Sequence, residues 1–178
     1  MEEGLILRPM TRVDVSRVYE IECACFRSPW SKNALAGELR NSVANYLVLE
    51  KDGLIVGYAG MWVLFDEAHI TNVAVMADHR KQGYGELIMR GMMDLALDKG
   101  ATQMTLEVRE HNVVAQRLYA RLDFVQNGFR PRYYDDTGEG ALLLWNRNIE
   151  ETLLKPPTGK PTEKQEGNSP EKALQSAP

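Results

Sequence analysis

A basic turn containing two glycines, between two apolar segments, constrains this chain more than any other feature. It covers residues 79–86 and separates a short valine-rich run at 71–76 from a long run in which apolar residues recur at spacings of three and four. The first run predicts a buried β-strand and the second an amphipathic α-helix. Lys99 followed by Gly100 predicts the end of that helix, because a cation in the last turn and then glycine is a common C-terminal signal. The segment therefore predicts a strand, a loop and a helix in succession.

The glycine-containing turn has the composition of an anion-binding loop. Gly83 and Gly85 carry no Cβ, so the backbone can approach a ligand closely there. The first amide groups of a helix have no acceptor within the helix, and the helix dipole is positive at that end, which favours a phosphate. The G-x-x-x-x-G-K-[ST] pattern of P-loops is absent, and Ile88 stands where the dinucleotide fingerprint requires a third glycine. A solvent-exposed basic turn with no ligand is the alternative, and the turn alone does not decide between them.

Length and composition indicate one globular domain, which we place at residues 1–150. The chain has 178 residues, of which 44% are hydrophobic, and its net charge of −4 argues against direct nucleic-acid binding. No secretory signal and no apolar run of membrane-spanning length is visible, so we expect a cytoplasmic protein that does not bind a membrane. Cys23 and Cys25 are too close in sequence for a disulfide that would stabilise the fold, and too few for a zinc site, so no metal is expected.

Residues 151–178 are predicted to be a disordered C-terminal tail, because Pro, Lys, Glu, Gly and Ser dominate the sequence from Lys155 onward.

The remaining pattern predicts an α/β fold with a mixed sheet. The step Asp52-Gly53 predicts an antiparallel hairpin, since both residue types tolerate positive φ. Residues 130–140 are expected to be irregular. Further strands are expected at 5–8, 45–50, 54–65, 104–108, 124–129 and 141–147, and further helices at 11–25, after Ser31, and at 112–122.

Glu107 is the strongest candidate for a catalytic residue. It lies in an apolar strand, on the face opposite Met104, Leu106 and Val108. A general base in a partly dry cleft would have its pKa raised by desolvation, toward the pH at which base catalysis is efficient. A surface carboxylate on a half-exposed strand is the commoner situation for a glutamate. From Glu107 alone both interpretations remain open.

Asn112 and Tyr119 are candidates for contact with a single ligand. They are seven residues apart on one predicted helix, and seven steps of about 100° return to nearly the same face. A phenol at the edge of a cleft can pack its ring and donate its proton. The alternatives are that Asn112 serves only as a helix cap and that Tyr119 belongs only to the apolar stripe of its helix.

Together, these motifs resemble one enzyme family. The order is R-x-x-G-x-G at 80–85, L-E-V-R at 106–109, then Asn112 and L-Y-x-x-L-x-F at 118–124. It resembles the GNAT superfamily of acetyl-CoA-dependent N-acetyltransferases and, within it, the RimI-type N-terminal acetyltransferases, over residues 5–147. One departure is Asp123, where these proteins usually have glycine before the phenylalanine.

The resemblance implies a GNAT fold, with a central twisted mixed sheet flanked by helices, and acetyl-CoA as co-substrate with no metal. It implies direct acetyl transfer to a protein N-terminus, most readily the N-terminal alanine of a small-subunit ribosomal protein, with Glu107 as base and Tyr119 as acid. The residues implied in cofactor binding are Val73, Ala74, Val75, Arg80, Lys81, Gln82, Gly83, Tyr84, Gly85, Glu86 and Asn112. The residues implied in substrate binding are Phe26, Trp30, Glu67, Tyr133 and Tyr134. An acetyltransferase for a small amine or a protein lysine, and a CoA-binding module without catalysis, are the alternatives.

Overall fold

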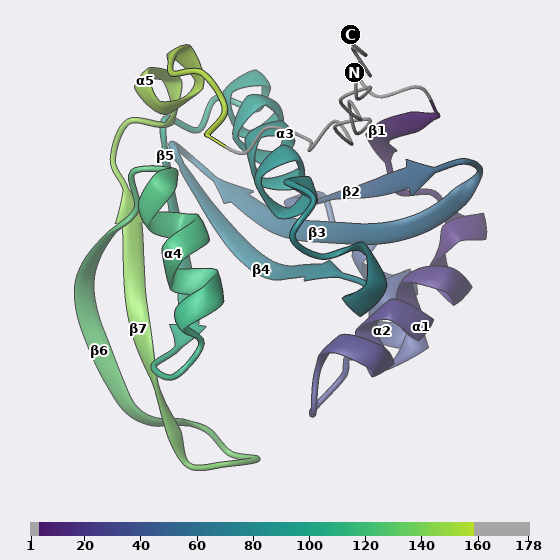
Figure 1. The fold of residues 1–178 in the computed structure, drawn as a ribbon, viewed down its shortest axis with the longest axis horizontal. Helices are drawn as coiled ribbons and strands as arrows, with labels where there is room; N and C mark the ends of the chain where they lie inside the picture. Colours follow the sequence, from purple (N-terminus) through teal and green to yellow (C-terminus); the bar gives the residue numbers. More distant parts are fainter. Residues whose placement is uncertain (1–3, 159–178) are drawn as a thin grey trace, which may run out of the picture.

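A twisted sheet of seven strands forms the middle layer of the protein (Figure 1). The computed structural model describes residues 4–158. The strands lie in the order β1-β2-β3-β4-β5-β7-β6, in which β4 and β5 are parallel and the other neighbours antiparallel. Their bounds are β1 (Leu5–Pro9), β2 (Ala44–Lys51), β3 (Leu54–Leu64), β4 (Glu67–Val75), β5 (Gln103–Arg109), β6 (Val125–Tyr134) and β7 (Glu139–Asn146). The predicted α/β class with a mixed sheet is confirmed.

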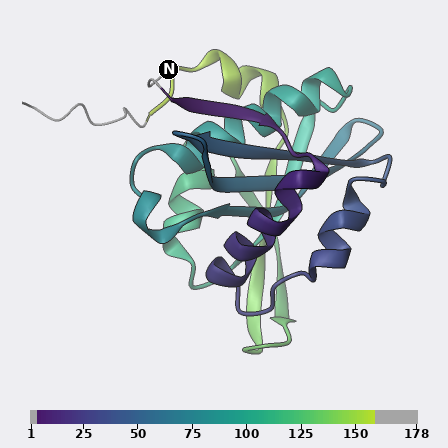
Figure 2. The same cartoon turned by 90° about the vertical axis from the view of Figure 1, so that its right-hand side faces the viewer.

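Helices cover both faces of the sheet (Figures 1 and 2). One face packs against α1 and α2, and the other against α3 and α4, with α5 beside α3. Their bounds are α1 (Val15–Cys25), α2 (Lys32–Glu38), α3 (Tyr84–Asp98), α4 (Val113–Arg121) and α5 (Ile149–Leu154), with 3₁₀ turns η1 (Arg12–Asp14) and η2 (Ala77–His79). No helix in the part of the chain that the structure describes is long and apolar enough to cross a membrane.

Local sequence signals set the helix boundaries much as predicted. The hydroxyl of Ser31 accepts a hydrogen bond from the Ala34 N–H at 3.1 Å and so caps α2. Gly83 precedes α3 with a φ of 82°, and Gly100 follows it with a φ of 90°. Both values lie in the left-handed region that glycine adopts without steric cost, which explains why these two glycines bracket the helix.

The sheet opens between β4 and β5. Their parallel pairing joins only residues 67–69 to residues 103–105. The β3–β4 register also shifts next to Gly60, so that Thr71 is an extra residue in β4. Beyond these pairs, residues 70–73 of β4 and residues 106–109 of β5 line a cavity between the strands.

Strand β6 is longer than the sequence predicted. Residues 130–134 were expected to be irregular, yet β6 continues to Tyr134. The alternation of apolar and polar residues that marks a strand is absent here, because β6 is the edge strand and is exposed along most of its length. Its register with β7 also shifts between Arg130 and Tyr134. An edge strand also tolerates Pro131, which has no N–H to donate to a neighbour.

The C-terminal helix α5 was not predicted. The expected boundary at residue 150 falls inside it, and residues 151–154 are helical rather than disordered. The side chain of Asn148 caps the helix by accepting the Glu151 N–H at 3.1 Å. Ile149 and Thr152 are buried. Residues 159–178, the rest of the predicted tail, lie outside the described residues.

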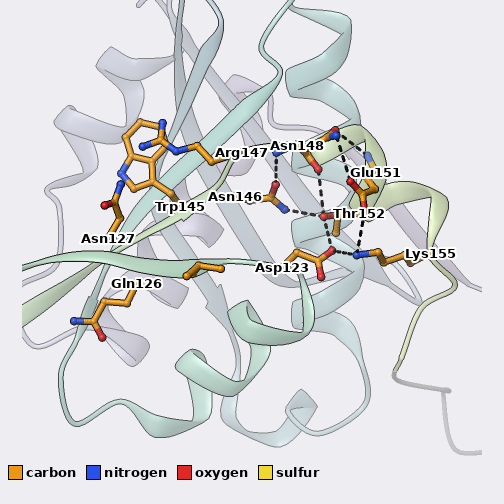
Figure 3. A pocket seen from close by; sticks show the side chains of 11 residues that line it. Asp123, Gln126, Asn127, Trp145, Asn146, Arg147, Asn148, Glu151, Thr152 and Lys155 are labelled. Carbon is orange, nitrogen blue, oxygen red and sulfur yellow. Dashed lines mark hydrogen bonds and ion pairs between the residues drawn. The ribbon is translucent and has the colours of Figure 1, made fainter.

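Hydrogen bonds fix α5 to the end of the sheet, at the edge of a surface cavity of about 410 Å³ (Figure 3). The Thr152 hydroxyl donates to Asp123 at 2.7 Å and accepts from the Asn146 side-chain amide at 2.8 Å. Lys155 forms an ion pair with the same Asp123 carboxylate at 2.8 Å. Asp123, Asn146, Thr152 and Lys155 therefore satisfy one another's polar groups at this cavity.

The segment that follows α5 is tied to α3. The backbone N–H and the hydroxyl of Thr158 donate to the Glu86 carboxylate at 2.8 and 2.9 Å. Arg90 donates to the Lys155 carbonyl at 2.9 Å. Glu86 is only 3% exposed, so these bonds help to satisfy a buried carboxylate.

We predict that truncation after Leu154 lowers the melting temperature by roughly 5 °C, because it deprives Glu86 of both Thr158 bonds. Truncation after Thr158 retains these bonds and is the matched control, with a smaller expected effect. Differential scanning calorimetry compares the two with the full chain. Equal melting temperatures for the two truncated proteins would contradict the prediction.

Candidate active site

A cavity of about 740 Å³ lies where β4 and β5 diverge. Its lining residues come from α1, the loop between α1 and α2, β4, β5, α4, and the hairpin formed by β6 and β7. Figure 1 shows where these elements lie in the fold. Eight residues that the sequence proposed as functional line it: Phe26, Trp30, Val73, Glu107, Asn112, Tyr119, Tyr133 and Tyr134. Segments distant in the sequence are thus brought to one site.

Glu107 lies on the wall formed by β5, with its side chain 9% exposed. The His69 Nε2 donates to its Oε2 at 2.7 Å, and Arg130 lies 3.0 Å from its Oε1. The His69 hydrogen bond, opposed by burial and supported by the charge of Arg130, lowers the pKa of Glu107 below its ordinary value. The prediction of a raised pKa is wrong, because two partners outweigh desolvation. Glu107 is a carboxylate at neutral pH.

His69 was not identified from the sequence. It lies on β4 at the last residue that pairs with β5, opposite Thr105. Its side chain is 39% exposed, and its ring makes an edge contact with Trp62 at 6.5 Å between centroids. The period-two pattern of β4 places His69 on one face of the strand, but only the parallel pairing with β5 brings it to Glu107.

Tyr119 belongs both to the core and to the cavity wall. Its ring packs edge-on against Phe124 at 5.7 Å and belongs to the core, while the residue also lines the cavity. Burial raises its pKa, so the phenol keeps its proton at neutral pH. Asn112 also lines the cavity, and its Oδ1 accepts the Ala115 N–H at 3.2 Å, which caps α4.

The glycine-containing loop follows the end of β4. The Leu87 N–H donates to the Gly83 carbonyl at 3.0 Å, which closes the first turn of α3. Arg80 Nε donates to the Val75 carbonyl at 2.8 Å and holds the loop against β4. Lys81 adopts a φ of 62°, so the backbone turns sharply through a left-handed conformation at both Lys81 and Gly83.

Two carboxylates proposed from the sequence, Glu67 and Glu86, do not line the cavity. Glu67 lies outside the cavity, at the start of β4, where it accepts a hydrogen bond from Gln103 at 3.4 Å. It precedes the first lining residue of β4, Ile70, by three residues, or about 10 Å of strand. The Glu86 carboxylate accepts hydrogen bonds from the N–H and the hydroxyl of Thr158.

The β6–β7 hairpin is held over the cavity by Arg109. This side chain stacks on the Tyr134 ring at 3.9 Å and forms ion pairs with Asp136 at 2.7 Å and Glu139 at 3.3 Å. Burial raises the pKa of Tyr134 to about 12. The neighbouring Tyr133 contacts Tyr134 edge-on at 5.1 Å, so the two aromatic side chains form one unit of the wall.

A buried carboxylate fixes the opposite wall. Glu22 of α1 has no exposed surface and accepts the Trp30 N–H at 3.0 Å, which anchors the loop between α1 and α2. Its other donors are the Tyr58 hydroxyl and the side-chain amide of Asn72, at 3.3 Å to Oε1. Burial raises the pKa of Glu22.

Comparison with known proteins identifies relatives over most of the chain. The profile of the acetyltransferase (GNAT) family matches residues 15–124. A Bacillus subtilis protein, provisionally assigned as a [ribosomal protein bS18]-alanine N-acetyltransferase, is 42% identical over 146 residues, 82% of this chain and 97% of its own. The Escherichia coli K12 [ribosomal protein bS18]-alanine N-acetyltransferase is 32% identical over 74% of this chain and 89% of its own.

A solved structure shares the fold. The crystal structure of the ribosomal-protein-S18-alanine N-acetyltransferase from Escherichia coli superposes with a TM-score of 0.73 at 28% identity. The match covers 79% of this chain and 92% of that one. The mixed sheet with helices on both faces is therefore the arrangement found in that enzyme, as the sequence predicted.

We predict that His69→Gln raises the pKa of Glu107, because the substitution weakens the largest contribution to its lowering. A carboxylate with a lowered pKa stabilises the fold above its unfolded-state pKa, and that stability is lost as pH falls through the folded-state value. The variant should therefore lose less stability on acidification. Carboxyl NMR titration measures the shift, and His79→Gln, outside the cavity, is the control. An unchanged Glu107 titration in His69→Gln would refute the assignment.

Proposed function

Because this chain belongs to the GNAT acetyltransferase family, and is therefore an acyltransferase, we propose that it acetylates the N-terminal amine of a protein, specifically the alanine of ribosomal protein bS18. The observation that carries this proposal is the cavity in which the carboxylate of Glu107 and the protonated phenol of Tyr119 both form part of the wall. The identity of the acceptor is supported by the activities for which the Bacillus and Escherichia relatives are named.

Acetyl-CoA fits the architecture as acetyl donor, and it supplies an activated thioester. The backbone of Val73, Ala74 and Val75 lies at the strand edge that leads from the cavity to the glycine-containing loop. The loop residues from Arg80 to Gly85 suit the pyrophosphate, because the helix dipole and the left-handed Gly83 favour close approach of an anion. At Gly85 an added Cβ would instead meet Leu118 at 3.1 Å, which indicates a role in helix packing.

The mechanism we propose is direct transfer between the two substrates. Glu107 receives a proton from the N-terminal ammonium group, and the neutral nitrogen attacks the thioester carbonyl. The new bond joins nitrogen to the acetyl carbon, the carbon–sulfur bond breaks, and Tyr119 donates its proton to the departing thiolate. His69 and Arg130 hold Glu107 ionised and fixed in direction. No covalent bond to the enzyme forms.

The lowered pKa of Glu107 favours an α-amine over a lysine side chain. An α-amine with a pKa of about 7.8 is roughly one-seventh neutral at pH 7, whereas a lysine with a pKa of about 10.4 is neutral in about one molecule in 2,500. A weakly basic carboxylate does little to remove this difference. Deprotonating lysine would require about 3.5 kcal/mol more than deprotonating the α-amine.

Substitution of the two proton-transfer residues tests the mechanism. We predict that Glu107→Gln and Tyr119→Phe each lower kcat by about 10² to 10⁴, with little effect on acetyl-CoA affinity. Glu20→Gln and Tyr19→Phe remove the same chemical groups outside the cavity and should leave kcat within about threefold. A loss below about threefold in either test variant would remove that residue from its role.

The acceptor is tested with two peptides. One has a free N-terminal alanine and no lysine, and the other has a blocked N-terminus and one internal lysine. We expect kcat/KM to be at least about a hundredfold higher for the first, because of the difference in neutral amine. Comparable values would reject the N-terminal acceptor in favour of a lysine acetyltransferase, and turnover of polyamines alone would indicate a small-amine enzyme.

A further inference from the structure

Asn72 combines three properties that the proposed mechanism does not use. It lies on β4 directly after the extra residue Thr71, and it lines the same cavity as Glu107 and Tyr119. It is 7% exposed. Its Oδ1 is buried and has no hydrogen-bond partner among residues 4–158. An acceptor buried without a donor is destabilising, so the oxygen has reason to gain a donor from a ligand.

The orientation of the Asn72 amide follows from its neighbour. Glu22 has two carboxylate oxygens that accept hydrogen bonds, and Asn72 Nδ2 lies 3.3 and 3.5 Å from them. These contacts place the amino group of Asn72 toward Glu22. The Trp30 N–H and the Tyr58 hydroxyl donate to the same carboxylate and hold it in place. Oδ1 is consequently the atom left for another donor.

The charge behind Asn72 indicates which donor suits it. A carboxylate bonded to the amino side of an amide polarises that amide and strengthens its oxygen as an acceptor. Glu107, which lines the same cavity, is a second carboxylate and is paired with Arg130 at 3.0 Å. An amide oxygen strengthened in this way favours a cationic donor over a neutral one. Acetyl-CoA offers only neutral amide donors near its thioester, whereas the second substrate offers an ammonium group.

We propose that Asn72 Oδ1 binds the amine of the acceptor substrate and directs its lone pair toward the thioester carbonyl, while Glu22 is the positioning residue that holds the Asn72 amide. This inference rests on the proposed function, since it assigns a contact to the acceptor of that reaction. The bulge at Thr71 contributes to this contact. Because successive side chains alternate between the two faces of a strand, one extra residue changes the face on which Asn72 lies.

A binding cycle between Asn72 and the substrate amine tests the contact. Binding is measured by calorimetry in the presence of CoA, for a peptide with an N-terminal alanine and for its des-amino analogue, which carries a propionyl group instead. In the wild type we expect the amine to bind about 10- to 100-fold more tightly than the analogue, as for a hydrogen bond to a charged group. In Asn72→Leu the difference should fall to within about threefold. If the amine-to-analogue affinity ratio is the same in the wild type and in Asn72→Leu, the proposal is wrong, even if Asn72→Leu binds both peptides more weakly.

Two further variants separate binding from folding. Asn72→Ser leaves a smaller side chain beside Glu22, and the same collapse of the ratio is expected if Asn72→Leu does not fold. Asn146 is a matched control, because it is 2% exposed, fully hydrogen-bonded and outside the cavity. Asn146→Leu should lower the melting temperature and leave the amine-to-analogue ratio unchanged. If the amine-to-analogue affinity ratio also changes in Asn146→Leu, lost stability alone alters the ratio. That result would overturn the assignment of the amine contact to Asn72.

Failure of this inference can be told apart from failure of the proposed function. If the wild type acetylates only lysine, the cycle is repeated with the lysine peptide and its norleucine analogue, and a ratio that collapses in Asn72→Leu supports the contact. If Asn72→Leu weakens acetyl-CoA binding about tenfold and leaves the amine ratio intact, the oxygen serves the acetyl donor and the proposal is wrong.

Discussion

The short parallel pairing between β4 and β5 is the constraint on which the rest of the site depends. Three residue pairs hold the two strands together, and beyond His69 and Thr105 they line the walls of the cavity. A continuous sheet would satisfy the backbone groups of both strands with each other. Because the strands separate, an edge of β4 becomes available to a ligand, while the antiparallel pairing of β4 with β3 and of β5 with β7 keeps each strand rigid.

The environments of two side chains separate the roles of base and acid. Glu107 has its pKa lowered by His69 and Arg130, whereas Tyr119 has its pKa raised by burial. One group is therefore charged and the other protonated at neutral pH, as the proposed proton transfers require. Each environment is made by a different part of the fold, because His69 comes from β4, Arg130 from β6, and the packing of Tyr119 from α4.

Polar side chains also hold two boundaries of the cavity, the loop between α1 and α2 and the β6–β7 hairpin. Glu22 anchors the loop between α1 and α2 through the Trp30 N–H, and Arg109 anchors the β6–β7 hairpin through Asp136 and Glu139. Burying Glu22 without these donors would be strongly unfavourable. The structure thus uses a buried carboxylate on one side and a stacked guanidinium on the other to keep the loops in defined positions.

The sequence by itself determined the α/β class, most element positions, and the loop at Gly83, because these depend on local periodicity and on which residues tolerate positive φ. It also placed Glu107, Asn112 and Tyr119 on faces that line one cavity, since strand and helix periods are fixed. Only the tertiary structure decided that His69 and Arg130 meet Glu107 and lower its pKa, that Glu67 lies outside the cavity, and that Asn72 faces Glu22. Those contacts join segments separated by 38 residues for His69 and Glu107 and 50 for Glu22 and Asn72, and they depend on strand order and register, which no local pattern encodes.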